Sequence, residues 1–347
     1  MAGELSGRRI LVTGGSGFIG RHVVAALTAA GARVRVIDLQ PHPDPEADLV
    51  LGDLADADAL EAALGGGVDG VVHLAAVTSV LRSLEQPDLT YRTNVAATHG
   101  LLEAARAAGA RALVFASTNA VTGPMDAPAI TEAATLRPLT PYGATKAAAE
   151  MLMSAYTASY GLRCCALRLT NVYGPGMQAK DSIVARLMRA IRLGREFEIY
   201  GDGRQVRDYV HVADVIQAVR RGLADDAWAG PMVIGAGRSL SVLEVVEAVR
   251  RVTGAELSVR HGPARTGEMP AVIVDPGRAL AAGWAPRYSF EQGLAGVWQE
   301  WSAIELDAVA AGVGASGVAA GPVSGSRAGA PAAPHDVATA AAVGGRR

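Results

Sequence analysis

Short apolar segments alternate with amphipathic ones along the first two-thirds of the chain. The apolar runs Arg9–Thr13 and Arg33–Asp38 predict two strands, and the apolar positions of 18–30 recur at helical spacing between them. The same rhythm continues, with strands predicted at 49–52, 70–76, Ala112–Thr118 and Arg163–Leu169 and helices at 87–108 and 144–160. Strands and helices alternating in this way indicate an α/β fold with a parallel, doubly wound sheet.

A glycine-rich turn joins the first predicted strand to the first helix. Its glycines are Gly14, Gly17 and Gly20, and an acid, Asp38, ends the next strand 18 residues after the last of them. Strand, glycine turn and helix in this order are the context of a dinucleotide-binding fingerprint. Gly14 permits the tight turn, Gly17 lets a pyrophosphate approach the helix N-terminus, and Gly20 lets helix and strand pack closely. A carboxylate at Asp38 would accept both adenosine ribose hydroxyls and repel a 2′-phosphate, which favours NAD over NADP.

The segment 140–146 places a tyrosine and a lysine four residues apart near the start of a predicted helix. Tyr142 and Lys146 therefore share one helical face. A lysine ammonium within roughly 4–6 Å lowers the pKa of a phenol, which is about 10 when unperturbed. The pair predicts a tyrosine that acts as a base near neutral pH. Such a pair is also common on ordinary amphipathic helices, so it gains weight only beside the glycine turn.

Composition narrows the function classes. The formal net charge is −2, which gives no sign of nucleic-acid binding, and no apolar run approaches the ~18 residues of a membrane span. The only cysteines, Cys164 and Cys165, are adjacent in an apolar run and predict core thiols; two are too few for a cysteine zinc site, and we expect no metal. His73 lies among apolar residues and is interpreted as a core histidine. The start of the chain lacks a signal-peptide pattern, so a cytoplasmic protein is expected.

The last forty residues have a different composition. From 308 to 347 the chain is rich in Ala, Gly, Pro and Ser and has no aromatic residue. A segment of this kind buries too little apolar surface to offset its chain entropy. We predict a disordered tail over 308–347.

Several motifs together resemble the extended short-chain dehydrogenase/reductase family. They are TGGSGFIG with Asp38, HLAA at 73–76, STNAVTG at 117–123, PYGATK at 141–146, RLTNVYGPG at 168–176, RDYVHVAD at 207–214 and RTGE at 265–268. Within the family the chain is similar to nucleotide-sugar epimerases of the UDP-galactose 4-epimerase type, over about 300 residues. The resemblance implies a Rossmann domain of residues 1–170 plus 208–230 that binds NAD. It also implies a smaller, discontinuous domain of 171–207 plus 231–307 that binds a UDP-sugar.

The resemblance also implies roles for individual residues. Tyr142 is the base, Thr118 aligns the sugar hydroxyl, and Lys146 bonds the nicotinamide ribose and lowers the pKa of the tyrosine. Cofactor contacts are implied for Gly14, Gly17, Phe18, Ile19, Gly20, Asp38, Asp53, Leu54, Leu74, Ala75, Ala76, Asn94, Ser117, Tyr142 and Lys146. Substrate contacts are implied for Thr78, Thr118, Asn119, Tyr142, Asn171, Arg207, Arg265, Glu268 and Val272. The resemblance further implies a homodimer, in which the helices carrying Asn94 and Tyr142 form a four-helix bundle with their symmetry mates.

Departures from the family patterns narrow the expected reaction. Family dehydratases carry an acidic pair after the strand-end Thr, where this chain has Asn119 and Ala120. Uronate epimerases typically carry a Thr and then an Arg around the NVYGPGMQ segment, where this chain has Asn171 and, as its only cation, Lys180. A UDP-hexose 4-epimerase is therefore favoured. A UDP-glucuronate or UDP-N-acetylhexosamine epimerase stays open, as does a dehydrogenase or ketoreductase with net redox.

Val272 has two interpretations. It matches a family position where a large aromatic walls the sugar pocket near C2, so a smaller side chain would admit an N-acetyl group. It also fits an ordinary buried strand residue.

Overall fold

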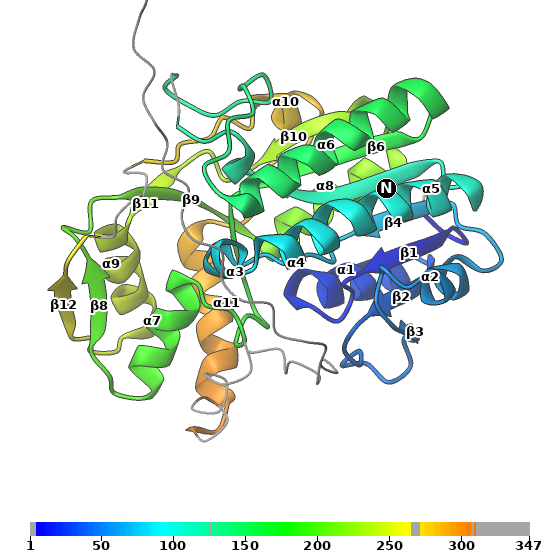
Figure 1. The fold of residues 1–347 in the computed structure, drawn as a ribbon. Coiled ribbons are helices and arrows are strands. Elements are labelled where there is room, and N and C mark those ends of the chain that lie inside the picture. Colours follow the sequence, from blue (N-terminus) through cyan, green and yellow to red (C-terminus); the bar gives the residue numbers. More distant parts are fainter. Residues whose placement is uncertain (1–4, 125–126, 265–270, 307–308, 310–347) are drawn as a thin grey trace, which may run out of the picture.

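Seven parallel strands form the central sheet of the computed structural model, which describes residues 5–124, 127–264, 271–306 and 309 (Figure 1). Their order is β10-β6-β5-β4-β1-β2-β3. The strands are β1 (Arg9–Thr13), β2 (Arg33–Asp38), β3 (Asp48–Leu51), β4 (Gly70–His73), β5 (Ala112–Thr118), β6 (Arg163–Leu169) and β10 (Gly230–Ile234). The predicted doubly wound α/β fold is confirmed.

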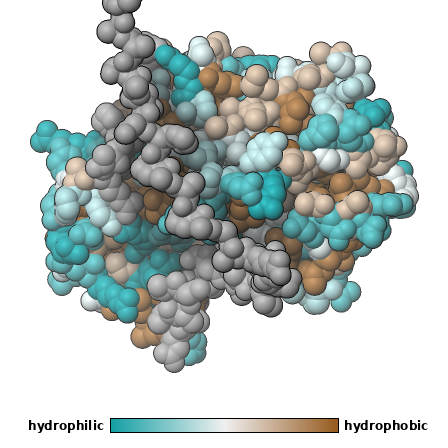
Figure 2. Space-filling model, in the orientation of Figure 1, coloured by the Kyte–Doolittle hydropathy of each residue, from teal (hydrophilic) through white to brown (hydrophobic). Residues whose placement is uncertain are grey.

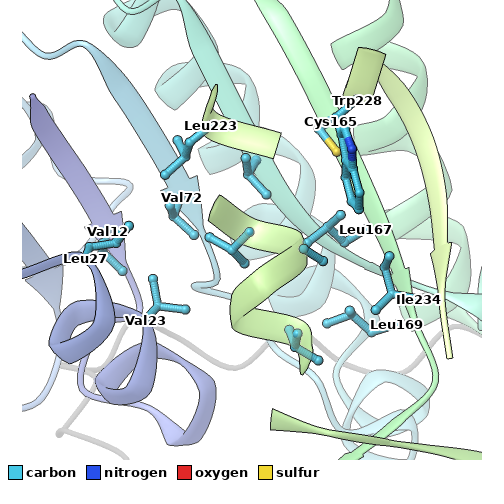
Figure 3. Close-up of a cluster of buried hydrophobic side chains, with 14 of the residues drawn as sticks. Val12, Val23, Leu27, Val72, Cys165, Leu167, Leu169, Leu223, Trp228 and Ile234 are labelled. Atoms are coloured by element: carbon cyan, nitrogen blue, oxygen red, sulfur yellow. The ribbon is translucent and has the colours of Figure 1, made fainter. Parts of the chain in front are cut away.

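Helices cover both faces of this sheet, because the middle strands β1, β4, β5 and β6 are buried along most of their length. One face packs on α1 (Phe18–Ala29) and α8 (Val212–Ala224), and Figure 3 shows part of that core, including Val23, Leu223 and the buried thiol of Cys165. The other face packs on α2 (Ala57–Leu64), α5 (Ala97–Ala107) and α6 (Pro141–Tyr160). Both cysteines are buried and free, as predicted.

The chain direction across the sheet reverses beside β1. The strands β2 and β3 follow β1 on one side, whereas β4 to β6 continue on the other. The connections after β1 and β4 therefore lead to opposite sides of the sheet, and the carboxyl edge at such a point is where open α/β sheets bind ligands in a crevice.

A smaller lobe lies beside the carboxyl ends of the strands (Figure 1). It contains the three-stranded sheet β11-β9-β7 and the pair β12-β8, packed with α7 (Ile183–Arg192), α9 (Val242–Thr253) and α11 (Phe290–Ala303) around a separate core. The strands are β7 (Asn171–Tyr173), β8 (Phe197–Tyr200), β9 (Val206–His211), β11 (Ser239–Ser241) and β12 (Val259–Gly262). The chain also forms the short helices α3 (Val80–Glu85), α4 (Pro87–Tyr91) and α10 (Gly277–Ala281).

The predicted domain boundaries need three corrections. β10 was assigned to the smaller domain, but it pairs in parallel with β6 at the edge of the main sheet. β9 was expected to return to the cofactor domain, but it pairs with β7 and β11; its Val210 still packs in the core that α8 shares with the main sheet. Val309, placed in the predicted tail, is buried in the core of the smaller lobe. Residues 308 and 310–347 lie outside the described residues.

The predicted helix 87–108 is three elements. Between α4 and α5 the residues Arg92–Ala96 form a turn of π-helix, which contains Asn94. A π-helical turn inserts an extra residue and redirects the side chains on its face, and such turns are frequent at functional sites.

Candidate active site

The glycine turn between β1 and α1 has room for a pyrophosphate. Gly14 has a φ of 70°, and a Cβ placed on it would lie 2.7 Å from the backbone N of Ala75, just after β4. A Cβ on Gly20 would lie 2.1 Å from the carbonyl oxygen of Gly14. Gly17 is exposed and starts α1 without any side-chain cap. Uncapped N–H groups at a helix N-terminus bind anions well, so the turn fits the diphosphate of a dinucleotide.

Asp38 stands beside this turn. Its carboxylate accepts the backbone N–H of Ser16 at 2.9 Å and that of Gln40 at 3.0 Å. These bonds fix the carboxylate at the carboxyl end of β2 and leave it further lone pairs for ribose hydroxyls. The geometry therefore fits the predicted NAD contact.

The remaining residues that were predicted to contact the cofactor near these strand ends differ in how exposed they are. Asp53 is exposed, and its carboxylate accepts the backbone N–H of Ala55 at 2.9 Å. Leu54 is only 9% exposed and packs in the core beneath α2. Of this pair, Asp53 is the one that a ligand can reach. The other predicted residues here are partly buried at the crevice: Phe18, Ile19, Leu74, Ala75 and Ala76.

Three hydroxyl groups hold the start of the tyrosine helix. Thr140 caps α6 by accepting the N–H of Gly143 at 3.2 Å, and the buried Ser83 of α3 accepts the N–H of Tyr142 at 3.2 Å. The Tyr142 side chain hydrogen-bonds Thr118, at the end of β5. The two predicted catalytic hydroxyl groups are therefore brought together at the carboxyl edge of the sheet.

Lys146 lies under this pair and is 2% exposed. Its ammonium donates to the carbonyl oxygen of Ala116 at 2.8 Å and lies 4.3 Å from the centre of the Phe115 ring. Burial lowers its pKa to about 7, against an opposing effect of Glu150.

The resemblance implies that Lys146 lowers the pKa of Tyr142, but the groups of the protein do not produce this effect. Burial raises the pKa of Tyr142 to about 12, and the group that lowers it, among those described, is Thr118. The reason is burial, which disfavours the charged phenolate more than the hydrogen bond with Thr118 favours it.

His73 is a core histidine, as predicted. Its ring nitrogens hydrogen-bond the hydroxyl groups of Thr13 at 2.7 Å and Thr98 at 2.8 Å. Burial, with a smaller contribution from the charge of Lys146, lowers its pKa to about 3. The imidazole is therefore neutral at physiological pH.

Asn94 has a different task from the predicted cofactor contact. Its amide oxygen accepts the N–H of Val77 at 2.8 Å, and its amide nitrogen donates to the carbonyl of Val77 at 3.0 Å and the hydroxyl of Thr145 at 3.1 Å. The side chain is 1% exposed. It ties the segment after β4 to the tyrosine helix instead of reaching into the crevice.

The Ser117 hydroxyl group, for which a cofactor contact was predicted, bonds a glutamate of the protein. This hydroxyl donates to the Glu150 carboxylate at 2.5 Å, and that carboxylate pairs with Arg168 at 2.8 Å. Sequence reasoning missed both ionic residues. The spacing of Glu150, four residues after Lys146, was a usable signal, whereas an arginine inside an apolar strand gave none.

The predicted substrate residues are spread around the crevice. Asn119 follows Thr118 in a short 3₁₀ turn, and Thr78 is exposed after β4. Asn171 donates its amide to the carbonyl of Asp208 at 2.8 Å, and Arg207 lies in the adjoining strand β9. Arg265 and Glu268 lie outside the described residues.

Val272 is 5% exposed and packs with Ile130, Val233 and Val274. Its backbone N–H donates to the carbonyl of Val206 at 3.1 Å. This environment agrees with the burial expected in the second interpretation, although Val272 lies between two isolated β-bridges and not in a strand.

We therefore expect Val272→Tyr to destabilise the protein by about 1–3 kcal/mol, because a ring overpacks this small cluster. Activity on plain and N-acetylated sugars should fall together, with a lower Tm. The matched control is Ile273→Tyr, since Ile273 is 40% exposed. A Val272→Tyr protein with an unchanged Tm and a selective loss on N-acetylated sugars would restore the pocket interpretation.

Among the described residues, no helix is long and apolar enough to cross a membrane. The same part of the chain holds no cluster of three or more His, Cys, Asp or Glu that could bind a metal ion.

Comparison with known proteins connects this site to a family. Residues 10–235 match the model of the NAD dependent epimerase/dehydratase family. The chain is 35% identical to a UDP-glucose 4-epimerase of Streptomyces lividans, over 84% of this chain and 95% of the relative. It is 36% identical to a dTDP-glucose 4,6-dehydratase of Mycolicibacterium smegmatis, over 82% and 91%.

A solved structure agrees with these relatives. The Thermus thermophilus UDP-glucose 4-epimerase in complex with NAD superposes with a TM-score of 0.79 at 34% identity, over 85% of this chain and 99% of that one. The range matched by the family model contains the glycine turn, Thr118 and the tyrosine helix described above. The chain belongs to the NAD-dependent epimerase/dehydratase family of extended short-chain dehydrogenases/reductases, and its cofactor is NAD.

Proposed function

We propose that the protein is a 4-epimerase that inverts C4 of a UDP-hexose through a transient 4-keto sugar. The observation that carries this proposal is the grouping of Thr118, Tyr142 and Lys146 beside the glycine turn, with no carboxylate at positions 119 and 120. Hydroxyl and phenol groups at the end of β5 and the start of α6 suit proton transfer at a sugar hydroxyl.

Each residue has a defined task in this reaction. When bound, NAD supplies the acceptor and donor of the C4 hydride. Tyr142 takes the proton of the C4 hydroxyl and later returns it, and Thr118 orients the same oxygen through its hydrogen bond to the phenol. Lys146 would donate a hydrogen bond to the nicotinamide ribose of NAD, as the family resemblance implies. The keto sugar must turn over in the site before reduction, so exclusion of water and retention of the intermediate matter.

The UDP moiety would lie against the smaller lobe. Arg207 lies on β9, and Asn171 lies on β7, the parallel strand beside it. A guanidinium suits the diphosphate because it offers paired N–H donors. We propose the same role for Arg265, and a ribose contact for Glu268.

A 4,6-dehydratase is the second candidate, since one of the relatives carries that name. Elimination across C5 and C6 needs an acid and a base at the sugar. Asn119 stands directly after Thr118, and Ala120 donates its backbone N–H to the Thr118 hydroxyl. Neither side chain exchanges protons at neutral pH, which disfavours this reaction.

The cofactor balance tests the proposal. The purified protein is incubated with UDP-glucose or UDP-galactose, without added NAD, and sugar products and NADH absorbance are followed together. Interconversion with no net NADH supports epimerisation. Stoichiometric NADH would instead indicate a dehydrogenase. A panel that adds UDP-N-acetylglucosamine, UDP-glucuronate and dTDP-glucose identifies the preferred sugar and nucleotide.

We also propose a homodimer through the helices that carry Asn94 and Tyr142. The outer faces of α4 and α6 expose Tyr91, Met151 and Tyr160, with exposed fractions of 55%, 67% and 57%. Figure 2 shows hydrophobic atoms at the surface on the side of the molecule where these helices lie. Large apolar side chains gathered on neighbouring helices are typical of a surface that another protein covers.

Met151→Glu should therefore split the dimer. Light scattering at micromolar concentration should give about twice the 35.5 kDa monomer mass for the natural protein and the monomer mass for the variant. Leu280→Glu on α10, where Leu280 is 46% exposed, is the control and should stay dimeric. A natural protein with the monomer mass would contradict the proposal.

A further inference from the structure

A buried ion pair lies one helical turn beyond Lys146. Glu150 and Arg168 are 8% and 3% exposed. Arg168 donates from Nη2 to one Glu150 oxygen at 2.8 Å, and its Nε lies 3.2 Å from both oxygens. Ser117 donates to the Glu150 carboxylate as well. The carboxylate is therefore held in one orientation by three donor groups.

This pair connects the elements that carry the catalytic residues. Ser117 and Arg168 are register partners on β5 and β6, and Ser117 directly precedes Thr118. Arg168 also donates to the backbone carbonyl of Glu132 at 3.1 Å, and the Glu132 carboxylate accepts the N–H of Val233 on β10 at 2.8 Å. The tyrosine helix, three strands and the loop after β5 are therefore joined through Arg168 and two carboxylates, those of Glu150 and Glu132.

Stability alone gives a weak reason for this arrangement. Burying two charges costs desolvation energy, and well-packed hydrophobic replacements of a buried pair are often as stable or more so. The more specific feature is the charged side chain one helical turn away from the carboxylate. Its i, i+4 neighbour on the helix is Lys146, which is itself buried.

The other charged and titratable groups near Lys146 do not replace Glu150. His73 on β4 is neutral at physiological pH, and Tyr142 on α6 is protonated in the protein alone. Arg168 on β6 carries the same charge as the lysine, and the contacts of the ammonium on β5 are a carbonyl and an aromatic ring. Glu150 is therefore the negative charge that acts on the ammonium, and it opposes the lowering of the lysine pKa by burial.

We propose that Glu150 is a positioning residue of the active site. Its carboxylate, fixed by Ser117 and Arg168, holds the Lys146 turn of α6 against β5 and increases the fraction of Lys146 that is charged at neutral pH. The consequence for catalysis rests on the proposed epimerase function, whereas the charge state of Lys146 does not.

The composition of the chain makes the charge state measurable. Lys146 and Lys180 are its only lysines, so a protein labelled with ¹³C at lysine Cε gives two signals. Lys180→Arg removes one signal and thereby assigns both. In the natural sequence the Lys146 signal should titrate with a midpoint near 7. In Glu150→Gln the midpoint should fall by about one pH unit, because a neighbouring opposite charge favours the charged form.

Two further variants guard against trivial explanations. Glu247→Gln, which removes an exposed carboxylate on α9, should leave the midpoint unchanged. Glu150→Gln combined with Arg168→Gln does not leave the Arg168 guanidinium buried without its partner, so it remains informative if the single variant does not fold. Its midpoint should move in the same direction, but less, because the repulsion from Arg168 is also lost. An unchanged Lys146 midpoint in Glu150→Gln would overturn the proposal. If Glu150→Gln does not fold, an unchanged midpoint in the double variant would overturn it.

Activity gives the second readout. If the midpoint moves from 7 to 6, the charged fraction of Lys146 at pH 7 falls about fivefold, and kcat should fall with it while KM changes little. The difference should close as the pH is lowered to 5, which a general loss of structure would not do. A natural protein that converts no nucleotide sugar would refute the proposed function and leave the NMR titration as the test of Glu150. An active protein whose Glu150→Gln variant keeps both its midpoint and its pH profile would refute the inference alone.

Discussion

Tyr142→Phe is expected to lower kcat for UDP-sugar interconversion by about 10²–10⁴-fold, the range in which a positioned acid–base group contributes. The variant removes the one phenol that hydrogen-bonds Thr118 at the sheet edge and keeps the ring that fills the site. NAD content and UDP affinity should stay within about twofold, since the glycine turn and the smaller lobe are untouched. Stopped assays of kcat and calorimetric binding of UDP separate the two effects.

Tyr156→Phe is the matched control. Tyr156 lies on the same helix, and its hydroxyl donates to Glu103 and not to a catalytic group. Its loss should cost about 1 kcal/mol of stability and leave kcat unchanged. A Tyr142→Phe protein that retains a tenth or more of the natural kcat would remove the tyrosine from the mechanism.

Gly20→Ala is expected to abolish NAD retention and lower the Tm by several degrees. A methyl group there would lie 2.1 Å from the carbonyl oxygen of Gly14 and 2.6 Å from the Cα of Gly15, both backbone atoms of the dinucleotide turn. Helix α1 must then move away from β1, and overpacking of this kind costs about 1–3 kcal/mol or more. Absorbance of released NAD in the denatured protein and a thermal melt measure the two consequences.

Gly296→Ala provides the comparison for that variant. Gly296 also lies inside a helix, but its Cβ would meet only Pro175, at an ordinary 3.7 Å. Alanine should therefore stabilise α11 by about 0.5–1 kcal/mol and leave the NAD content unchanged. Equal behaviour of the two variants would show that close approach at Gly20 is not what holds the cofactor turn.

Local signals in the sequence were sufficient to predict most strands of the central sheet. The strands Arg9–Thr13, Arg33–Asp38, Ala112–Thr118 and Arg163–Leu169 appear with the predicted bounds, because each is a short segment with several apolar residues that is followed by turn residues. The strand β10 was assigned to the wrong lobe, since nothing in five residues indicates which sheet edge they will join. Long-range pairing, unlike helix or strand formation, has no local signature.

In the candidate site, too, some features have local signals in the sequence and others depend on long-range contacts. The glycine spacing, Asp38 and the Tyr142–Lys146 pair follow from short motifs, and the structure brings them to one crevice. The π-helical turn at Asn94 and the Ser117–Glu150–Arg168 network depend on contacts between residues up to 51 positions apart. Motif matching assigned Asn94 and Ser117 to the cofactor because it registers which residue types occur, not which partner each side chain turns toward.

The central claim, redox at C4 with return of the same hydride, is tested most directly with UDP-glucose deuterated at C4. The account predicts UDP-galactose that retains the deuterium at C4, with no net NADH. Three results would contradict it. Deuterium at C6 of a 4-keto-6-deoxy product would indicate a dehydratase, deuterium in accumulated NADH would indicate a dehydrogenase, and loss of the label to water during inversion would exclude hydride return.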